Sequence, residues 1–193
     1  MSRRVLVVLS DGFEDIEAVV PLDIMKRVGF EVTVAGLSST TVRGAYGATL
    51  TVEATLNDVA GDSFDAIVLP GGRANAENLA RSPQVAAMVR RMHAERKVVA
   101  AICASVGLVL AEAAGILVGK RATGFPAFDE KLSQGGAIIT GELVTVDGNI
   151  VTGMGAGAAI PFGLAICAGL GAERAAAELA RGWWIETLPR PVR

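Results

Sequence analysis

The chain has 193 residues, with 18 basic and 20 acidic side chains, a net charge of −2 and 51% hydrophobic residues. This length suits a single domain over residues 1–193. A folded chain of this size buries roughly 70% of the surface of its extended form, which is enough for a core without metal or disulfide support. The near-neutral charge and the lack of any long basic run argue against nucleic acid or an anionic membrane surface as the main partner.

The apolar residues are not arranged as a membrane span or a signal peptide. The longest apolar run, near residues 102–114, contains Glu112, whereas a span needs roughly 20 uninterrupted apolar residues. The N-terminus has only five apolar residues before Ser10, too few for a signal peptide. We therefore expect a cytoplasmic protein in which Cys103 and Cys167 are free thiols, with no bound metal or cofactor.

Short β-branched runs alternate with longer helical patterns along the chain. The predicted strands are 5–9, 31–35, 65–69, 98–102, 122–123, 143–146 and 150–152. The predicted helices are 14–28, 83–96, 105–114, 126–133, 158–168 and 172–181, and residues 42–52 predict an extra hairpin. This alternation, with continuously apolar strands, predicts an α/β fold with a doubly wound, mainly parallel sheet between helical layers.

Ligands of such folds bind at the carboxyl ends of the strands, so the residues after each strand are the candidates for chemistry. The first strand is followed by Glu14, Asp15 and Glu17, which would repel a phosphate and exclude a dinucleotide site there. The late segment 153–157 is rich in glycine but lacks the spacing of a nucleotide loop, and we interpret it as a tight turn.

Cys103 is the most informative of these residues. It lies where an apolar strand turns directly into a helix, an arrangement that resembles a nucleophile elbow. The helix N-terminus predicts a stabilised thiolate with a lowered pKa. The N–H of Ala104 and those of Gly71 and Gly72 are candidates for an oxyanion hole. The alternative is a small buried apolar residue, the interpretation that we favour for Cys167 in its apolar helix.

The expected proton partner of Cys103 is an acid. The single histidine, His93, precedes the strand 98–102 and should lie at its opposite end, roughly 16 Å from Cys103. Glu17 falls on the apolar face of the first helix, where a carboxyl is either paired or has a raised pKa. We therefore predict a hydrogen bond between Glu17 and Cys103, the alternative being a solvated carboxylate.

Four segments together resemble the ThiJ/PfpI superfamily, in the branch of the parkinsonism-associated protein deglycase. They are 11–28 (DGFEDIEAVVPLDIMKRV), 32–37 (VTVAGL), 65–72 (DAIVLPGG) and 100–104 (AAICA), followed by a glycine-rich turn before 160–166. The resemblance implies a flavodoxin-like sandwich, a homodimer and an oxidation-sensitive Cys103. It also implies a protonated Glu17 that donates to the Cys103 thiolate, and an oxyanion-binding turn at Gly71, Gly72 and Ala104.

The chain departs from this superfamily at two positions. The protease-like branch has a histidine directly after the nucleophile, where this chain has Ala104, which argues against a peptidase. Several glyoxalase-active members have a histidine just before the proline of the loop after the fifth strand, and here that position is Phe125, a candidate substrate-binding residue. Addition of Cys103 to an aldehyde stays open, with Glu17 moving the proton.

The resemblance leaves two functions open. The first is a glyoxalase III or deglycase-like enzyme, a lyase or hydrolase whose Cys103 attacks a small reactive carbonyl compound. The second is a redox-responsive stress protein or chaperone whose Cys103 senses an oxidant. Isonitrile hydratase-like hydration shares the fold, but no residue favours it. Trp183 and Trp184 are interpreted as packing or dimer-capping residues.

Overall fold

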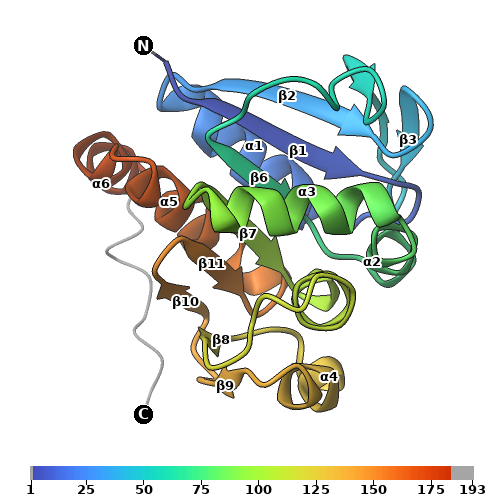
Figure 1. Ribbon diagram of the computed structural model, residues 1–193. Coiled ribbons are helices and arrows are strands. Elements are labelled where there is room, and N and C mark those ends of the chain that lie inside the picture. Colours follow the sequence, from blue (N-terminus) through green and yellow to red (C-terminus); the bar gives the residue numbers. More distant parts are fainter. Residues whose placement is uncertain (1, 184–193) are drawn as a thin grey trace.

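The computed structural model describes residues 2–183 as a seven-stranded sheet between two layers of helices (Figure 1). The strand order is β10-β11-β7-β6-β1-β2-β5, and only the β10–β11 pair is antiparallel. The strands are β1 (Arg4–Leu9), β2 (Glu31–Gly36), β5 (Ala54–Thr55), β6 (Ala66–Leu69), β7 (Val98–Ile102), β10 (Val144–Asp147) and β11 (Ile150–Gly153). The predicted α/β fold with a mainly parallel sheet is confirmed.

Each face of the sheet has its own apolar core. Successive side chains of a strand point to opposite faces, so Leu6 and Val8 of β1 join one core while Val5 and Val7 join the other. The first core is covered by α2 (Arg73–Ala80), α3 (Pro83–Ala94), η1 (Val106–Ala113) and α4 (Asp129–Gln134). The second is covered by α1 (Asp15–Arg27), α5 (Ala159–Gly169) and α6 (Glu173–Gly182). In Figure 1, α3 lies in front of the sheet and α1 behind it.

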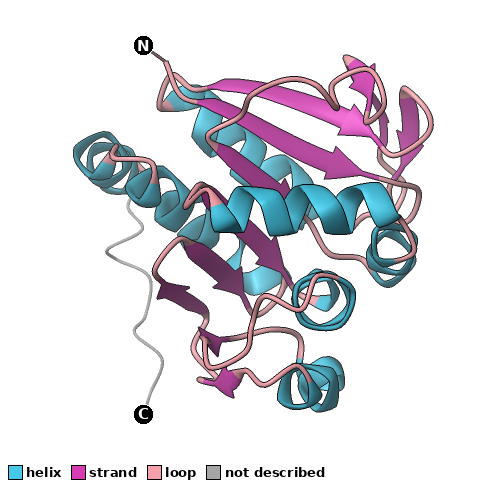
Figure 2. Ribbon diagram, in the orientation of Figure 1, coloured by secondary structure: helices cyan, strands magenta, loops and turns pink. Residues whose placement is uncertain are grey.

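Two small β-structures lie outside the central sheet (Figure 2). The predicted hairpin over 42–52 is confirmed as β3 (Thr41–Arg43) paired with β4 (Thr49–Thr51). The predicted strand 122–123 corresponds to β8 (Arg121–Ala122), which pairs with β9 (Ile138–Ile139) and not with the sheet. Side chains of the central sheet accept hydrogen bonds from the backbone here. Arg121 N donates to the Asp147 carboxylate, and Thr123 N, just after β8, donates to the Thr152 hydroxyl.

Three predicted helices differ in detail. The segment predicted as a helix over 105–114 forms η1, which has the wider π-helical winding, a form that is rare and often found at functional sites. The segment 126–133 divides into a 3₁₀ turn, η2 (Pro126–Phe128), and the helix α4. A second 3₁₀ turn, η3 (Ala156–Ala158), precedes α5. Within residues 2–183, no helix is long and apolar enough to cross a membrane.

The described chain ends at Trp183, beyond α6. Its ring is partly buried against the core that α1 and α5 cover, and the Arg27 guanidinium lies over it at 5.3 Å from the centroid. The packing role predicted for Trp183 is therefore confirmed. Trp184 lies outside the described residues, and the dimer-capping role stays a prediction.

Candidate functional site

Cys103 occupies a sharp turn between a strand and a helical segment. It directly follows β7, and its φ of +61° lies in the left-handed region that few residues other than glycine adopt. Cys103 N donates to Gly153 O at 2.9 Å, and the Ser105 hydroxyl donates to Pro70 O at 2.6 Å. These bonds hold the strained turn at the carboxyl end of the sheet, with the thiol partly exposed. The predicted elbow geometry is confirmed.

Glu17 comes to the same edge from the first turn of α1. The Glu14 carboxylate caps that helix by accepting from Glu17 N at 2.8 Å. The Glu17 side chain is only 1% exposed, and its Oε2 accepts from Gly71 N at 2.9 Å. The carboxyl also lies beside Cys103, because a Cβ placed on Gly71 would meet both side chains, and its charge raises the thiol pKa. Glu17 and Cys103, which the sequence analysis predicts as partners, therefore lie together in the structure.

Burial controls the pKa of both groups. It raises the pKa of Glu17 to about 7, an effect that the hydrogen bond to Cys103 partly opposes. Burial also raises the pKa of the Cys103 thiol to about 12, and the charge of Glu17 adds to this. The amides of Ala104 and Gly72 lower the thiol pKa but are outweighed. The lowered thiol pKa predicted from the helix N-terminus is therefore wrong, because desolvation exceeds the amide contribution.

The two groups titrate as a pair. Above pH of about 7 the pair holds one proton, because Glu17 has released its own and the thiol retains its proton. Transfer of that proton from sulfur to the carboxylate gives a thiolate beside a protonated Glu17 without any change of net charge. The sequence resemblance implied a protonated Glu17 beside a Cys103 thiolate. This is one of the two forms of the singly protonated pair, the other being a Glu17 carboxylate beside a Cys103 thiol.

The backbone donors around the thiol differ from those predicted. Gly71 N is engaged by Glu17, so it is not a free oxyanion donor. The N–H groups of Gly72 and Ala104 point to the Cys103 sulfur, and their oxyanion role stays a prediction. Glycine is required at Gly71, where an added Cβ would collide with the Glu17 carboxylate and lie 2.6 Å from Cys103 Cβ.

Asn75, which the sequence analysis missed, braces the loops around this site. Its side chain is fully buried and accepts from Ser10 N at 2.7 Å. It also donates to Pro70 O and Gly71 O at 2.8 and 3.1 Å. Asn75 therefore joins the exits of β1 and β6. The only sequence signal for it is its position, five residues after Pro70.

A cavity of about 850 Å³ opens onto Cys103 and Glu17. Phe125 lines it with a side chain that is 46% exposed, and its substrate-binding role stays a prediction. Phe125 N donates to Cys103 O at 3.4 Å, so the backbone of Phe125 is bonded to the turn that carries Cys103. Phe128 and Tyr46 add two further aromatic rings to the lining.

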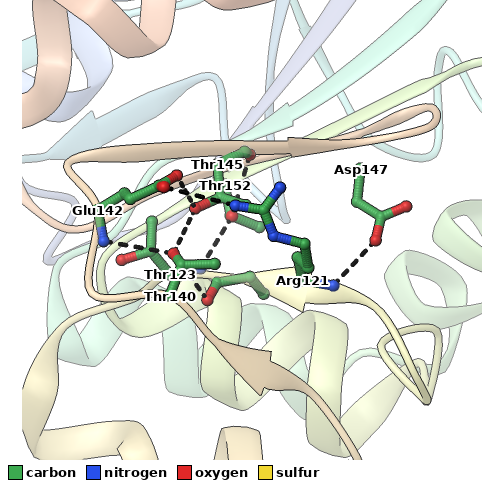
Figure 3. A network of polar contacts seen from close by, with 8 residues as sticks. Arg121, Thr123, Thr140, Glu142, Thr145, Asp147 and Thr152 are labelled. Atoms are coloured by element: carbon green, nitrogen blue, oxygen red, sulfur yellow. Dashed lines mark hydrogen bonds and ion pairs between the residues drawn. The ribbon is translucent and has the colours of Figure 1, made fainter.

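A network of threonines and charged side chains holds the loop that carries Phe125 (Figure 3). Thr123 N donates to Thr152 Oγ1 at 3.1 Å, and this hydroxyl donates to the backbone of β10 at 3.3 Å. Arg121 N donates to the Asp147 carboxylate at 2.9 Å. These bonds attach residues 121–123 to the edge of the central sheet. They thereby position Phe125, which lies two residues further along the chain.

His93 and Cys167 lie apart from the site. His93 lines a separate hollow of about 680 Å³ with Arg96 and Val98, where β7 begins, so its predicted place at the opposite end of this strand from Cys103 is confirmed. It is half-buried, and its Nδ1 has no hydrogen-bond partner among the described residues, which differs from the ordinary surface residue expected. Cys167 is fully buried in α5, as predicted.

The sequence profile of the DJ-1/PfpI family matches residues 3–169. Protein dj-1beta of Drosophila melanogaster is 33% identical over 183 residues, which cover 94% of this chain and 97% of that protein. A protein named as a deglycase, from Pyrococcus abyssi, is 36% identical over 149 residues, covering 77% of this chain and 88% of that one. Protein DJ-1 homolog B of Arabidopsis thaliana is 40% identical over 84% of this chain, but the match spans only 37% of the plant protein.

Solved structures agree with these matches. The crystal structure of Drosophila melanogaster DJ-1beta superposes with a TM-score of 0.89 at 31% identity, covering 95% of this chain and 98% of that one. A structure of Toxoplasma gondii DJ-1 described as oxidised has a TM-score of 0.89 at 32% identity, with the same coverage. The structural similarity therefore covers nearly all of this chain and nearly all of these two DJ-1 structures.

Proposed function

Because the chain belongs to the DJ-1/PfpI family, we propose that it is a cysteine-dependent enzyme that acts on reactive carbonyl compounds, in the manner of a glyoxalase III or deglycase. The observation that carries this proposal is the pairing of Cys103, on its strained turn, with the buried carboxyl of Glu17 at the base of an open cavity. Several relatives named as deglycases support the activity class.

The reaction begins with proton transfer within the pair. Glu17 takes the thiol proton of Cys103 as the sulfur bonds to the aldehyde carbon of an α-oxoaldehyde such as methylglyoxal. The carbonyl electron pair moves to oxygen, which the amides of Gly72 and Ala104 stabilise and which Glu17 then protonates. The product is a neutral hemithioacetal on Cys103, and Glu17 is again a carboxylate.

The remaining steps need no external oxidant. Moving the hydrogen of the aldehyde carbon to the neighbouring ketone carbon oxidises the first and reduces the second, leaving a thioester of a 2-hydroxy acid. Water cleaves this thioester and restores the Cys103 thiol, so the net reaction adds one water to the substrate. Glu17 is the proton carrier throughout, because Phe125 offers no ionisable group.

The test is the rate of methylglyoxal consumption by four proteins. Cys103→Ala is expected to lose at least about a thousandfold in kcat/KM, as nucleophile removal does elsewhere. Glu17→Gln is expected to lose about a hundredfold, because the proton carrier is removed. Cys167→Ala is the matched control, a second thiol deletion remote from the cavity. A Cys103→Ala protein as active as the wild type would exclude this function.

A second candidate function is a response to oxidants through the same thiol. The oxidised state named for the Toxoplasma gondii structure favours it, as does the partial exposure of Cys103. Two molecules of hydrogen peroxide would convert the thiol to a sulfinic acid and release two waters, with Glu17 donating a hydrogen bond to the sulfinate. The test is mild peroxide followed by mass spectrometry of the Cys103 peptide. An unmodified peptide excludes this function.

We also propose that the chain forms the homodimer implied by its sequence. Ile16 and Val19 on α1 are 51% and 41% exposed, and they lie one helical turn apart beside Glu17. Contact with a second copy would remove this apolar surface from water. Light scattering should give about twice the 19.8 kDa chain mass, and Ile16→Glu should give the monomer. A monomeric wild type would contradict the proposal.

A further inference from the structure

The cavity beside Cys103 has an aromatic and apolar lining that small carbonyl compounds would leave largely unfilled. We propose that this site prefers α-oxoaldehydes that carry an aromatic group over small aliphatic ones, with Phe125 as a specificity-determining residue. The inference rests on the proposed function and names the substrate class of the same site.

Phe125 stands close to the reacting groups. A Cβ placed on Gly155 would lie 3.6 Å from Phe125 Cδ2 and 3.9 Å from Glu17 Oε1. The phenyl ring and the carboxyl therefore flank the same bare glycine. The backbone of Phe125 is also within hydrogen-bonding distance of Cys103 O. A substrate bonded to the sulfur would place its substituent within reach of this ring.

Phe128 and Tyr46 extend the aromatic wall. Phe128 packs in a small cluster with Cys103 and Ala104, and it approaches η1 closely because that helix has Gly107 at the contact. It is therefore held in place on the side of the nucleophile. Tyr46, in the turn between β3 and β4, lines the cavity while its side chain is 81% exposed, which places it at the rim. The lining thus offers one fixed ring beside the thiol and one at the entrance.

The charges of the lining do not favour an anionic substituent. Both cations that line the cavity have carboxylate partners: Arg73 pairs with Glu77 at 3.0 Å and Lys131 with Glu112 at 2.6 Å. Glu14 and Glu130 add negative charge to the same lining. A carboxylate or phosphate on the substrate would meet these acids, so an uncharged substituent fits the site better.

The size of the cavity supports a larger substituent. Its volume of about 850 Å³ is at the upper part of the range of roughly 300–1,000 Å³ for small-molecule sites. Methylglyoxal has only a methyl group to place against the rings. A phenyl group would exclude water from the faces of Phe125 and Phe128 and meet their rings in edge-to-face or offset contact.

The first experiment compares kcat/KM for phenylglyoxal and methylglyoxal in the wild type and in Phe125→Ala. We expect the wild type to favour phenylglyoxal by at least about tenfold, and Phe125→Ala to reduce this ratio about tenfold. Val118→Ala is the matched control, because Val118 is 74% exposed and does not line the cavity. The preference is refuted if methylglyoxal is the better substrate, or if Phe125→Ala leaves the ratio unchanged.

A second readout does not depend on turnover. Phenacyl bromide and bromoacetone share one electrophilic group, but the first carries a phenyl group where the second carries a methyl group. The ratio of their rates of Cys103 alkylation is divided by the same ratio for free cysteine. This normalised ratio reports the aromatic preference of the site directly. We expect a normalised ratio of about ten that Phe125→Ala abolishes. If this ratio is found but neither oxoaldehyde is consumed, the reaction is wrong and the aromatic site is retained. If oxoaldehydes are consumed and the ratio is one, only the substrate class is wrong.

Discussion

The two cysteines of this chain both have a raised pKa but differ in what surrounds the thiol. Burial raises the pKa of each thiol to about 12. Cys167 is fully buried in α5, where burial is the only cause of its shift. Cys103 is partly exposed at a left-handed turn, with a buried carboxyl beside it. The resting pKa of a thiol therefore does not identify the reactive one. A neighbouring group that can accept its proton, and an open path to it, distinguish Cys103.

The largest expected difference between the two thiols is in their reactivity. In the native protein, iodoacetamide should label Cys103 at least about a thousandfold faster than Cys167, because the buried thiol reacts only after α5 opens. In denaturant the two rates should converge. Peptide mass spectrometry over time measures both rates. Equal native rates would remove the distinction between the two sites.

The next effect concerns stability. The pKa of Glu17 is raised from 4.5 to about 7, so between these pH values the unfolded chain has lost this proton while the folded chain retains it. The free energy of unfolding should therefore fall by roughly 3 kcal/mol as pH rises through this window, and stay level above it.

Glu17→Gln removes this titration. Urea unfolding should find the variant more stable than the wild type by up to roughly 3 kcal/mol at pH 8, and nearly equal to it at pH 4. Glu178→Gln is the matched control, because its side chain is 59% exposed and its ion-pair partner among residues 2–183 is the exposed Arg174, so its effect should stay within about 0.5 kcal/mol. The raised pKa would be refuted if the free energy of unfolding of Glu17→Gln, minus that of the wild type, did not increase between pH 4 and pH 8.

The pH dependence of alkylation sharpens the comparison further. If the singly protonated pair is the reactive form, alkylation of Cys103 should rise with pH to a midpoint near 7 and fall about tenfold per unit below it. In Glu17→Gln that midpoint should vanish, and the rate should rise only as the thiol itself ionises. Cys167, whose pKa is shifted by burial and not by an acidic neighbour among the described residues, should have no midpoint near 7. A midpoint that persists in Glu17→Gln would assign it to another group.

The smallest expected effect has opposite signs at the two positions. Cys103→Gly should be more stable than Cys103→Ala by about 1 kcal/mol, because glycine adopts a φ of +61° without strain. Cys167→Gly should be less stable than Cys167→Ala by about 1 kcal/mol, because glycine is unfavourable within a helix. Thermal or urea unfolding of the four variants measures both differences. A Cys103→Gly protein that is no more stable than Cys103→Ala would refute the strained turn.

Local patterns in the sequence were sufficient to place Cys103 and Glu17. The first marks a strand exit and the second interrupts an apolar helix face, and both signals depend on neighbouring residues alone. The helix α2 was missed because its sequence, RANAENLA, has a fully buried Asn75 in place of an apolar stripe. The two-residue strands β5 and β9 were missed because they are too short for an alternating pattern.

The electrostatics of the site could not be predicted in the same way. The sign of the Cys103 pKa shift depends on how much protein surrounds the sulfur, which results from the packing of segments distant in sequence, such as Phe128 and the loop at Gly71. The engagement of the Gly71 amide by Glu17 also requires two segments far apart in the sequence to meet. Charge and hydrogen-bond competition of this kind are decided by tertiary contacts.

The glycines around Cys103 and Glu17 differ in how far each tolerates a side chain. A side chain at Gly71 would collide with Glu17, and one at Gly72 would collide with the backbone at Gly12. Gly155 has an extended φ of 171° that any residue adopts, and a Cβ there would make only ordinary contacts with Phe125 and Glu17. An engineer seeking new selectivity would therefore begin a library at position 155, where alanine or serine adds a group beside Glu17 without moving the backbone.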